Sequence, residues 1–341
     1  MGGETVEKEP LSPCSRLFNS PDFNCAIIVT MGCKVKGNPS AIIDGLKHTL
    51  VNHPRFSSIL EMKNGKKGKP SWVRTKFRVE EHVIVPDIDP DIENPEHFDD
   101  VKLVKKAMNM TVNDVLLGVT QAGLSRYLSR RYDQEATPKS KESMRRIRLR
   151  LAIMINLRPN TGIEALADMM ARKSKCRWGN LFGYILLPFS GGLETDPLEF
   201  LRRDKVTVDR KKHSLEAVFS MAFFKLILKF LGLKASVVLI RKVIHNTTLT
   251  LTLTFSNVVG PKEEITFHGH PLSYISPSVF GHPHALNLTL HFQSYGNKVI
   301  ISVTADPTVV PDPHKMCDDL VESLKLIKLC VLERGLYEME V

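Results

Sequence analysis

The chain has 341 residues, 43% of them hydrophobic and 25% charged, which suits two globular domains with an apolar core and excludes a disordered or fibrous protein. Lysine and arginine number 47 against 37 acidic residues, and the resulting net charge of +10 favours anionic partners. Basic clusters occur at residues 63–69, 126–131, 145–150 and 202–212, and none interleaves aromatic side chains in the manner of a base-stacking platform, so we expect solvated helix faces and no nucleic-acid partner.

The first third of the chain alternates between strand and helix patterns, which is the order of an α/β sheet. Residues 25–35 form an apolar run that predicts a buried strand. Asn38 is a favourable N-cap for a helix over residues 39–52, and strands are predicted at 56–62 and 72–79.

The remaining two thirds continue this alternation. Helices are predicted at residues 99–108, from Thr111 or Asn113 to 132, at 163–171, 197–211 and 313–332, and strands at 148–156 and 180–187. Leucine and phenylalanine alternate with threonine up to Phe255, which predicts a further strand. Apolar runs at 285–292 and 299–303 are joined by Tyr295-Gly296-Asn297, a composition typical of a hairpin turn.

Residues 217–240 are the longest apolar stretch, but Lys225, Lys229 and Lys234 interrupt it, so it should not span a membrane. At helical spacing one face carries Phe219, Phe223, Leu226, Ile227 and Phe230. This face suits a helix lying in a membrane interface. The alternative, which base rates favour, is a core helix with its lysines at the solvent edge.

The six cysteines contain no C-x-x-C pair, so neither a disulfide framework nor a zinc site is predicted. Residues 1–10 carry Glu4, Glu7 and Glu9 in place of a basic and apolar leader, so no secretory signal is expected and the thiols should face a reducing cytosol. His268 with His270 and His282 with His284 form two H-x-H pairs. Because a loop with Gly269 and Pro271 is expected around the first pair and Pro283 separates the second, we expect core or surface histidines and no metal site.

Several short motifs resemble one family by their order and spacing. They are Pro10-Leu11-Ser12-Pro13, MTVNDVLLG at residues 110–118, Asn156-Leu157-Arg158-Pro159, CRWGN at 176–180, SNVVGP at 256–261, HPLSYI at 270–275 and DPHKMCDD at 312–319. Together they resemble the plant wax ester synthase/diacylglycerol acyltransferase (WSD-type O-acyltransferase) family over almost the whole chain. The resemblance implies an α/β, two-lobed CoA-dependent acyltransferase fold of the chloramphenicol acetyltransferase type, with a tunnel between the lobes.

One expected motif is missing. The family carries HHxxxDG, whose second histidine is thought to act as general base, yet no two of the 12 histidines are adjacent and no histidine pair precedes Asp44-Gly45. The missing stretch is expected between Phe98 and Asp99. The resemblance therefore implies a partial N-terminal lobe at residues 1–98, a C-terminal lobe at 99–341 and no catalytic histidine. A first lobe without an inner strand should expose strand edges and apolar faces.

The resemblance also implies a set of substrate-binding residues. Ser256, Asn257 and Gly260 match the end of a second-lobe strand beside the tunnel, and Asn156 and Arg158 match another segment of that lobe. Asn257 would donate to the acyl oxygen, or else satisfy the backbone of a strand-to-turn junction. Ser12 would contact substrate or, as the favoured alternative, cap a turn.

The implied reaction is acyl transfer from acyl-CoA, the co-substrate, to a long-chain alcohol or to diacylglycerol, which forms wax esters or triacylglycerol without a metal or other cofactor. The basic charge would then favour a membrane surface and the CoA phosphates. The implied location is the cytosolic face of the endoplasmic reticulum membrane, or the plasma membrane. Two alternatives remain open: a catalytically silent, truncated homologue that binds acyl-CoA, membrane or a full-length relative, and an unrelated anion-binding protein.

Overall fold

The structure is a computed structural model. It describes residues 8–11, 13–20, 25–53, 56–61, 70–86, 99–133, 148–158, 181–190, 192, 194–212, 214–248, 253–280 and 288–336. The expected helix at 163–171 and the residues Ser12, His282 and His284 lie outside these ranges.

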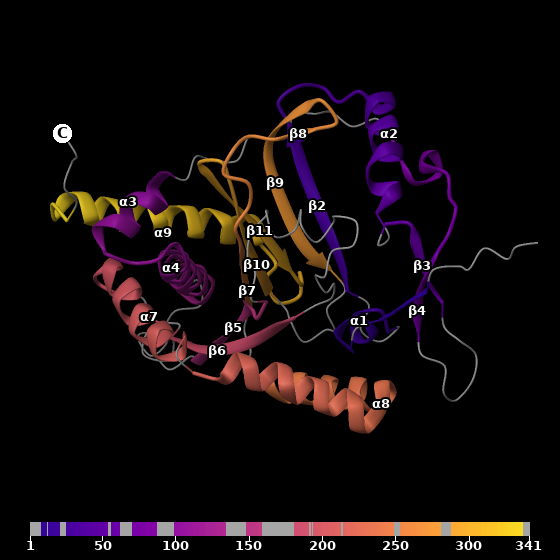
Figure 1. Ribbon diagram of the computed structural model, residues 1–341. Coiled ribbons are helices and arrows are strands. Elements are labelled where there is room, and N and C mark those ends of the chain that lie inside the picture. The colour runs from indigo at the N-terminus through magenta and orange to yellow at the C-terminus, as the bar shows by residue number, and fades with distance from the viewer. Residues whose placement is uncertain are drawn as a thin grey trace, which may run out of the picture.

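A five-stranded sheet forms the centre of the molecule (Figure 1). Its order is β11 (Lys298–Ala305), β10 (Leu288–Tyr295), β7 (Leu253–Val258), β5 (Arg148–Asn156) and β6 (Phe182–Ser190). The three inner strands are parallel to one another, while β6 and β11 pair antiparallel at the two edges. Strand β5 has the predicted bounds, and the hairpin between β10 and β11 turns at Gly296, whose φ of 54° confirms the predicted turn.

Four helices pack together beside this sheet: α3 (Asp99–Ala107), α4 (Val112–Asp133), α7 (Pro197–Lys212) and α9 (Pro313–Glu333). Two glycines of α4 allow close approach. A Cβ on Gly118 would lie 2.5 Å from Leu201 of α7, and one on Gly123 would lie 2.7 Å from Leu320 of α9. Because α4 is enclosed by α7, α9 and the sheet, nearly all of its side chains between Asp114 and Arg130 are buried.

Strand β7 is buried on both faces, although its sequence alternates between apolar residues and threonine. Leu253 and Thr254 are 0% and 2% exposed, because β5 and β10 flank the strand and other layers cover both faces. Phe255 packs against Phe292 of β10 with ring centroids 5.0 Å apart.

The strands of the first hundred residues belong to two smaller sheets. One has the order β1 (Lys8–Pro10), β4 (Ser71–Arg74) and β3 (Ser58–Glu61), and the other β2 (Ala26–Cys33), β9 (His270–Phe280) and β8 (Thr266–Phe267). Helices α1 (Pro13–Phe18) and α2 (Pro39–His48) and the short η2 (Leu50–Asn52) and η3 (Val79–His82) complete this part. Asn38 accepts hydrogen bonds from the Ser40 and Ala41 amides, which confirms the predicted cap of α2.

Strand β9 was not predicted. The prediction of a loop around His270 and Pro271 is wrong, because both residues belong to β9. Pro271 and Pro277 resemble turn signals, yet β9 pairs antiparallel with β2 along eight positions. His270 helps to hold the two segments together: its Nε2 accepts from the Asn38 amide at 3.0 Å and its Nδ1 lies 3.2 Å from the Phe267 carbonyl oxygen. A strand from residues 1–98 therefore pairs with one from the C-terminal part of the chain.

The prediction that the strand at residues 25–35 is buried is wrong. Ile27 is 72% exposed, Ile28 47% and Val29 48%. In the part of the chain that the structure describes, β2 pairs only with β9, and no helix layer packs on its faces. An apolar run predicts burial, but a strand is buried only where another layer packs on its face. No such layer covers β2 in the described part of the chain.

Helix α8 (Glu216–Thr248) runs along the outside of the molecule beside β6 and α1 (Figure 1). Ala217, Met221 and Ile227 are buried, whereas Phe219, Phe223, Leu226 and Phe230 are exposed. The expected core helix is therefore wrong for these four exposed residues, whereas Ile227, one turn after Phe223, is buried at the edge of the face that they form. Within the described residues, no helix is both long and apolar enough to cross a bilayer.

Candidate functional site

The candidate site lies where the parallel strands of the central sheet end and α4 begins. In open α/β sheets, ligands bind outside the carboxyl ends of parallel strands. Helix α4 starts with a capping box: the Thr111 amide donates to Asp114 Oδ2 at 2.9 Å, and the Asp114 amide donates to Thr111 Oγ1 at 3.3 Å. These two bonds fix the first turn of the helix, which carries Asn113.

Asn257 at the end of β7 faces that first turn. Its Nδ2 donates to Asn113 Oδ1 at 2.5 Å. Asn113 is exposed and Asn257 half-buried, so both amides can be reached from solvent. A primary amide carries two N–H groups, and this hydrogen bond uses one of them, so Asn257 retains the chemistry to donate to a substrate oxygen.

Asn156 and Arg158 lie at the end of the neighbouring strand. The Arg158 amide donates to Asn156 Oδ1 at 3.0 Å, which closes a turn directly after β5. Since Ile153 of β5 is opposite Phe255 of β7, Asn156 ends its strand at the same edge of the sheet as Asn257. The structure therefore brings these predicted residues to one edge.

Ser256 and Gly260 have other surroundings. Ser256 is 8% exposed and lies in the sheet opposite His291 of β10, so its side chain is not presented at the surface. The Gly260 amide donates to Ser294 Oγ at 3.1 Å, and a Cβ on this glycine would lie 2.1 Å from the Ser294 carbonyl oxygen. Gly260 is thus required for close packing of the loop after β7 against β10.

Sequence reasoning recognised the motif that contains Asn113 but did not assign this residue to the site. The available signal was the spacing Thr111-x-x-Asp114, which predicts a capping box and hence a helix starting beside Asn113. It could not show that Asn257 faces this turn, because the two residues are 144 positions apart.

Neither histidine of the first H-x-H pair belongs to this edge. Both ring nitrogens of His270 are engaged by backbone groups, as described above, and the His268 ring lies against Phe267 and Gly45. Among the described residues, no group of three or more histidine, cysteine or acidic side chains is arranged to hold a metal ion.

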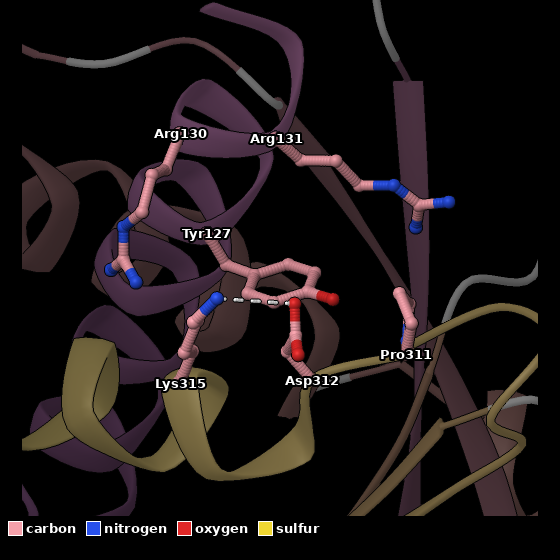
Figure 2. A pocket seen from close by; sticks show the side chains of 6 residues that line it. All are labelled: Tyr127, Arg130, Arg131, Pro311, Asp312 and Lys315. Atoms are coloured by element: carbon pink, nitrogen blue, oxygen red, sulfur yellow. Dashed lines mark hydrogen bonds and ion pairs between the residues drawn. The ribbon is translucent and has the colours of Figure 1, made fainter. Parts of the chain in front are cut away.

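A small pocket of about 80 Å³ lies at the opposite end of α4 (Figure 2). Tyr127, Arg130 and Arg131 line it from α4, and Pro311, Asp312 and Lys315 from the start of α9. Its charges are largely compensated: Arg130 pairs with the buried Asp319, and Lys315 lies 3.4 Å from Asp312. An α-helix rises about 1.5 Å per residue, so the length of α4 separates this pocket from Asn113 at the other end of the helix. The pocket is therefore remote from the candidate site. Its volume is also too small for a long acyl chain.

Comparison with solved structures identifies the fold. The structure of polyketide synthase associated protein 5 from Mycobacterium tuberculosis matches 96% of this chain and 99% of that chain, with 10% sequence identity and a TM-score of 0.52. The wax ester synthase/diacylglycerol acyltransferase from Marinobacter aquaeolei VT8 matches 69% of this chain and 47% of that chain, with 19% identity and a TM-score of 0.45. The first of these two matches shows the fold, which is the α/β fold of the two-lobed, CoA-dependent acyltransferases.

Sequence comparison gives the family. The family model described as WS/DGAT C-terminal domain matches residues 178–328. Wax ester synthase/diacylglycerol acyltransferase 11 of Arabidopsis thaliana is 60% identical over 485 residues, covering 99% of this chain and 98% of that protein. The chain belongs to the wax ester synthase/diacylglycerol acyltransferase family, a family of acyltransferases.

The same alignment bears on the missing motif. It extends over 485 positions, 144 more than the 341 residues of the chain, so the relative has many residues that face a gap in this chain. That the gap lies between Phe98 and Asp99 and contains HHxxxDG stays a prediction.

Proposed function

We propose that the chain carries the second-lobe half of an acyl-CoA-dependent O-acyltransferase site, which forms wax esters from long-chain alcohols or triacylglycerol from diacylglycerol. The observation that carries this proposal is the amide pair of Asn257 and Asn113 at the carboxyl edge of the parallel strands. Membership of the acyltransferase family supports the reaction class.

In this reaction the alcohol oxygen attacks the thioester carbonyl, a C–O bond forms, and the C–S bond then breaks to release CoA. Negative charge develops on the carbonyl oxygen in between, and a fixed amide donor stabilises it because little reorganisation is needed at that moment. Asn257 would supply this donor, and Asn113 is a positioning residue that holds the Asn257 amide in place.

The attack also requires a base that removes the alcohol proton. Loss of a positioned base typically slows such a reaction about 10²- to 10⁴-fold. The sequence contains no HHxxxDG, so we expect this chain by itself to retain at most weak transfer activity.

A second candidate function is favoured by the uncovered strand β2. Its outer edge is unpaired in the described part of the chain, and Ile27, Ile28 and Val29 are exposed. An apolar strand with an open edge is a template for another chain. The chain would then be a catalytically silent homologue that binds acyl-CoA, membrane or a full-length relative.

The proposed location is the cytosolic face of the endoplasmic reticulum membrane, or the plasma membrane. The net charge of +10 and the exposed phenylalanines of α8 support a membrane surface as partner. The long-chain substrates of the proposed reaction would reside in the same membrane.

The test compares two proteins in one assay: this chain, and this chain with the corresponding segment of the Arabidopsis relative inserted between Phe98 and Asp99. Labelled palmitoyl-CoA is supplied with hexadecanol or with diacylglycerol, and ester formation is measured. Activity confined to the restored protein supports the proposed half-site and the silent character of this chain. A restored protein that folds and binds palmitoyl-CoA but forms no ester contradicts the proposal.

Comparable activity in both proteins would contradict the role assigned to the missing motif. Binding of palmitoyl-CoA by the unmodified chain, measured by calorimetry, separates both candidates from an unrelated anion-binding protein, which would bind inorganic pyrophosphate equally well.

A further inference from the structure

Helix α8 is a bent element whose two segments fold toward each other. Gly232 has a φ of 70° and a ψ of 175°, which interrupts the helical backbone. Ser236 Oγ donates to the Ile227 carbonyl oxygen at 3.1 Å, although a straight helix would separate residues nine positions apart by about 13 Å. The chain therefore reverses at Gly232, where glycine tolerates the positive φ.

The first segment of α8 is fixed to the edge strand β6. The Tyr184 amide donates to Ser220 Oγ at 2.9 Å and the Leu186 amide to Glu216 Oε1 at 2.9 Å, so α8 side chains satisfy amides at the edge of the sheet. A Cβ on Gly183 would lie 1.9 Å from the Ala217 carbonyl oxygen, which shows how closely helix and strand approach. The orientation of the opposite face is therefore set by the fold.

That opposite face is a continuous apolar surface. Phe219 is 69% exposed, Phe223 45%, Leu226 54% and Phe230 72%. Phe219 and Phe223 stack with ring centroids 6.1 Å apart, so the rings lie side by side along the helix. Large exposed apolar patches on soluble proteins mark binding surfaces.

The charge of this element has one sign. Between Ala217 and Thr248 the sequence contains no acidic residue, and its basic residues are Lys225, Lys229, Lys234, Arg241 and Lys242. Lys225 and Lys229 are exposed one turn apart on one flank of the apolar face, and Lys229 Nζ lies 5.7 Å from the centroid of the Phe230 ring. A lysine flank beside a phenylalanine and leucine face is typical of helices that lie in a membrane interface.

We propose that α8 is the membrane-binding element of this protein and that it lies in the surface of an anionic lipid bilayer, with Phe219, Phe223 and Phe230 among the acyl chains and Lys225 and Lys229 at the headgroups. This inference rests on the part of the proposed function that gives the chain a membrane partner. It does not require that the chain catalyse acyl transfer. Charge complementarity selects the lipid surface over a second copy of the chain, since two α8 faces would bring lysines together without acidic partners.

Vesicle flotation tests the proposal. The chain is mixed with vesicles of phosphatidylcholine alone or with 30% phosphatidylserine. The variant Phe219→Ser/Phe223→Ser/Phe230→Ser should reduce binding to the anionic vesicles by roughly tenfold or more, because apolar insertion is lost. Lys225→Gln/Lys229→Gln should remove most of the preference for phosphatidylserine, and high salt should have the same effect on the unmodified chain.

Matched controls remove similar side chains elsewhere. Ile59→Ser/Ile84→Ser/Val85→Ser deletes exposed apolar groups outside α8, and Lys76→Gln/Lys105→Gln deletes two exposed lysines. Both control proteins should bind vesicles as the unmodified chain does. Circular dichroism shows whether each variant is folded, which is expected because the substituted side chains are exposed.

Depth of insertion gives a second measurement. Phe230→Trp places an indole on the apolar face, and Ile84→Trp places one on an unrelated exposed site. Lipids brominated on their acyl chains should quench the added indole of Phe230→Trp and leave that of Ile84→Trp unchanged. Vesicle binding that survives the phenylalanine substitutions, with no added quenching in Phe230→Trp, would overturn the role of α8 while leaving the membrane partner in place.

An unmodified chain that does not float with either vesicle would overturn both the role of α8 and the membrane partner. Loss of self-association in the phenylalanine variant, measured by light scattering, together with unchanged flotation, would identify α8 as an interface between copies of the chain and would also overturn the proposal. None of these results depends on ester formation, which is tested separately in the restored protein.

Discussion

Asn257 of β7 donates a hydrogen bond of 2.5 Å to Asn113 in the first turn of α4, and this contact joins two of the motifs that lie far apart in the sequence. The capping box of Thr111 and Asp114 fixes the helix end, so the position of the Asn257 amide is determined by the helix as well as by the strand. A donor held in this way is preorganised, which is what stabilisation of a developing oxyanion requires.

The role of Asn257 can be tested in the restored protein. Asn257→Ala should lower kcat by roughly 10²-fold, the usual effect of removing one oxyanion donor, with little change in KM. Asn113→Ala should have a smaller effect, because it removes only the group that positions the amide. Steady-state kinetics with palmitoyl-CoA measure both parameters. A variant whose KM rises while kcat is unchanged would show that Asn257 binds the substrate without stabilising the transition state.

Gly260 should tolerate no side chain. In Gly260→Ala the new Cβ would lie 2.1 Å from the Ser294 carbonyl oxygen and 2.3 Å from Gln293 Nε2, so the loop must shift. We expect the free energy of unfolding to fall by about 1–3 kcal/mol, as in other overpacked sites. Gly37→Ala is the matched control, since its nearest contact would be Ile42 Cδ1 at 3.5 Å, an ordinary van der Waals distance. Urea unfolding of both variants gives the comparison, and equal stabilities would contradict the prediction.

Asp204 should make stability depend on pH. Burial raises the pKa of its carboxyl group from 3.8 to about 7, against a smaller opposing effect of Arg203, and among the described side chains none donates to its Oδ2. The folded state thus keeps a proton that the unfolded state releases near pH 4. The contribution of Asp204 to the free energy of unfolding is therefore fully present below about pH 4, and this contribution is lost as the pH rises through about 7.

Asp204→Asn is neutral at every pH and should abolish that loss. At pH 8 the variant should exceed the unmodified chain by up to about 4 kcal/mol in free energy of unfolding, and at pH 4 the two should be similar. Chemical unfolding at both pH values measures the difference. The exposed Asp318→Asn serves as control and should change little. A gain of equal size at pH 4 and pH 8 would indicate a packing effect instead of titration.

The exposed strand β2 should promote self-association. Ile27 and Val29 lie two residues apart on one face of the strand, 72% and 48% exposed. Ile27→Thr/Val29→Thr should change the free energy of unfolding by no more than about 0.5 kcal/mol, because these side chains pack little. The same variant should aggregate less than the unmodified chain. Leu272→Thr, at a position of β9 that is 1% exposed, should instead destabilise the fold. Light scattering against concentration measures the association, and unchanged aggregation of the β2 variant would contradict the prediction.

Local signals predicted many of the individual elements. Strand β5 has its predicted bounds, α9 differs from its prediction by one residue, and the Asn38 cap and Gly296 turn are confirmed, because caps, turns and periodicity depend on neighbouring residues. The motifs also sufficed to predict the family, which the Arabidopsis relative confirms. Strand β9 was missed because two prolines within it resemble turn signals, whereas its pairing with β2 is a contact between distant parts of the chain.

The sequence by itself determined many of the elements, the family and the absence of adjacent histidines, since each of these is read from short stretches of neighbouring residues. Only the tertiary structure decided which apolar residues are covered. Strand β2 and the phenylalanine face of α8 have core-like sequences and are exposed, because burial depends on a second layer contributed from elsewhere. For the same reason only the structure could bring Asn113 to Asn257, since 144 residues of chain must fold before the two amides meet.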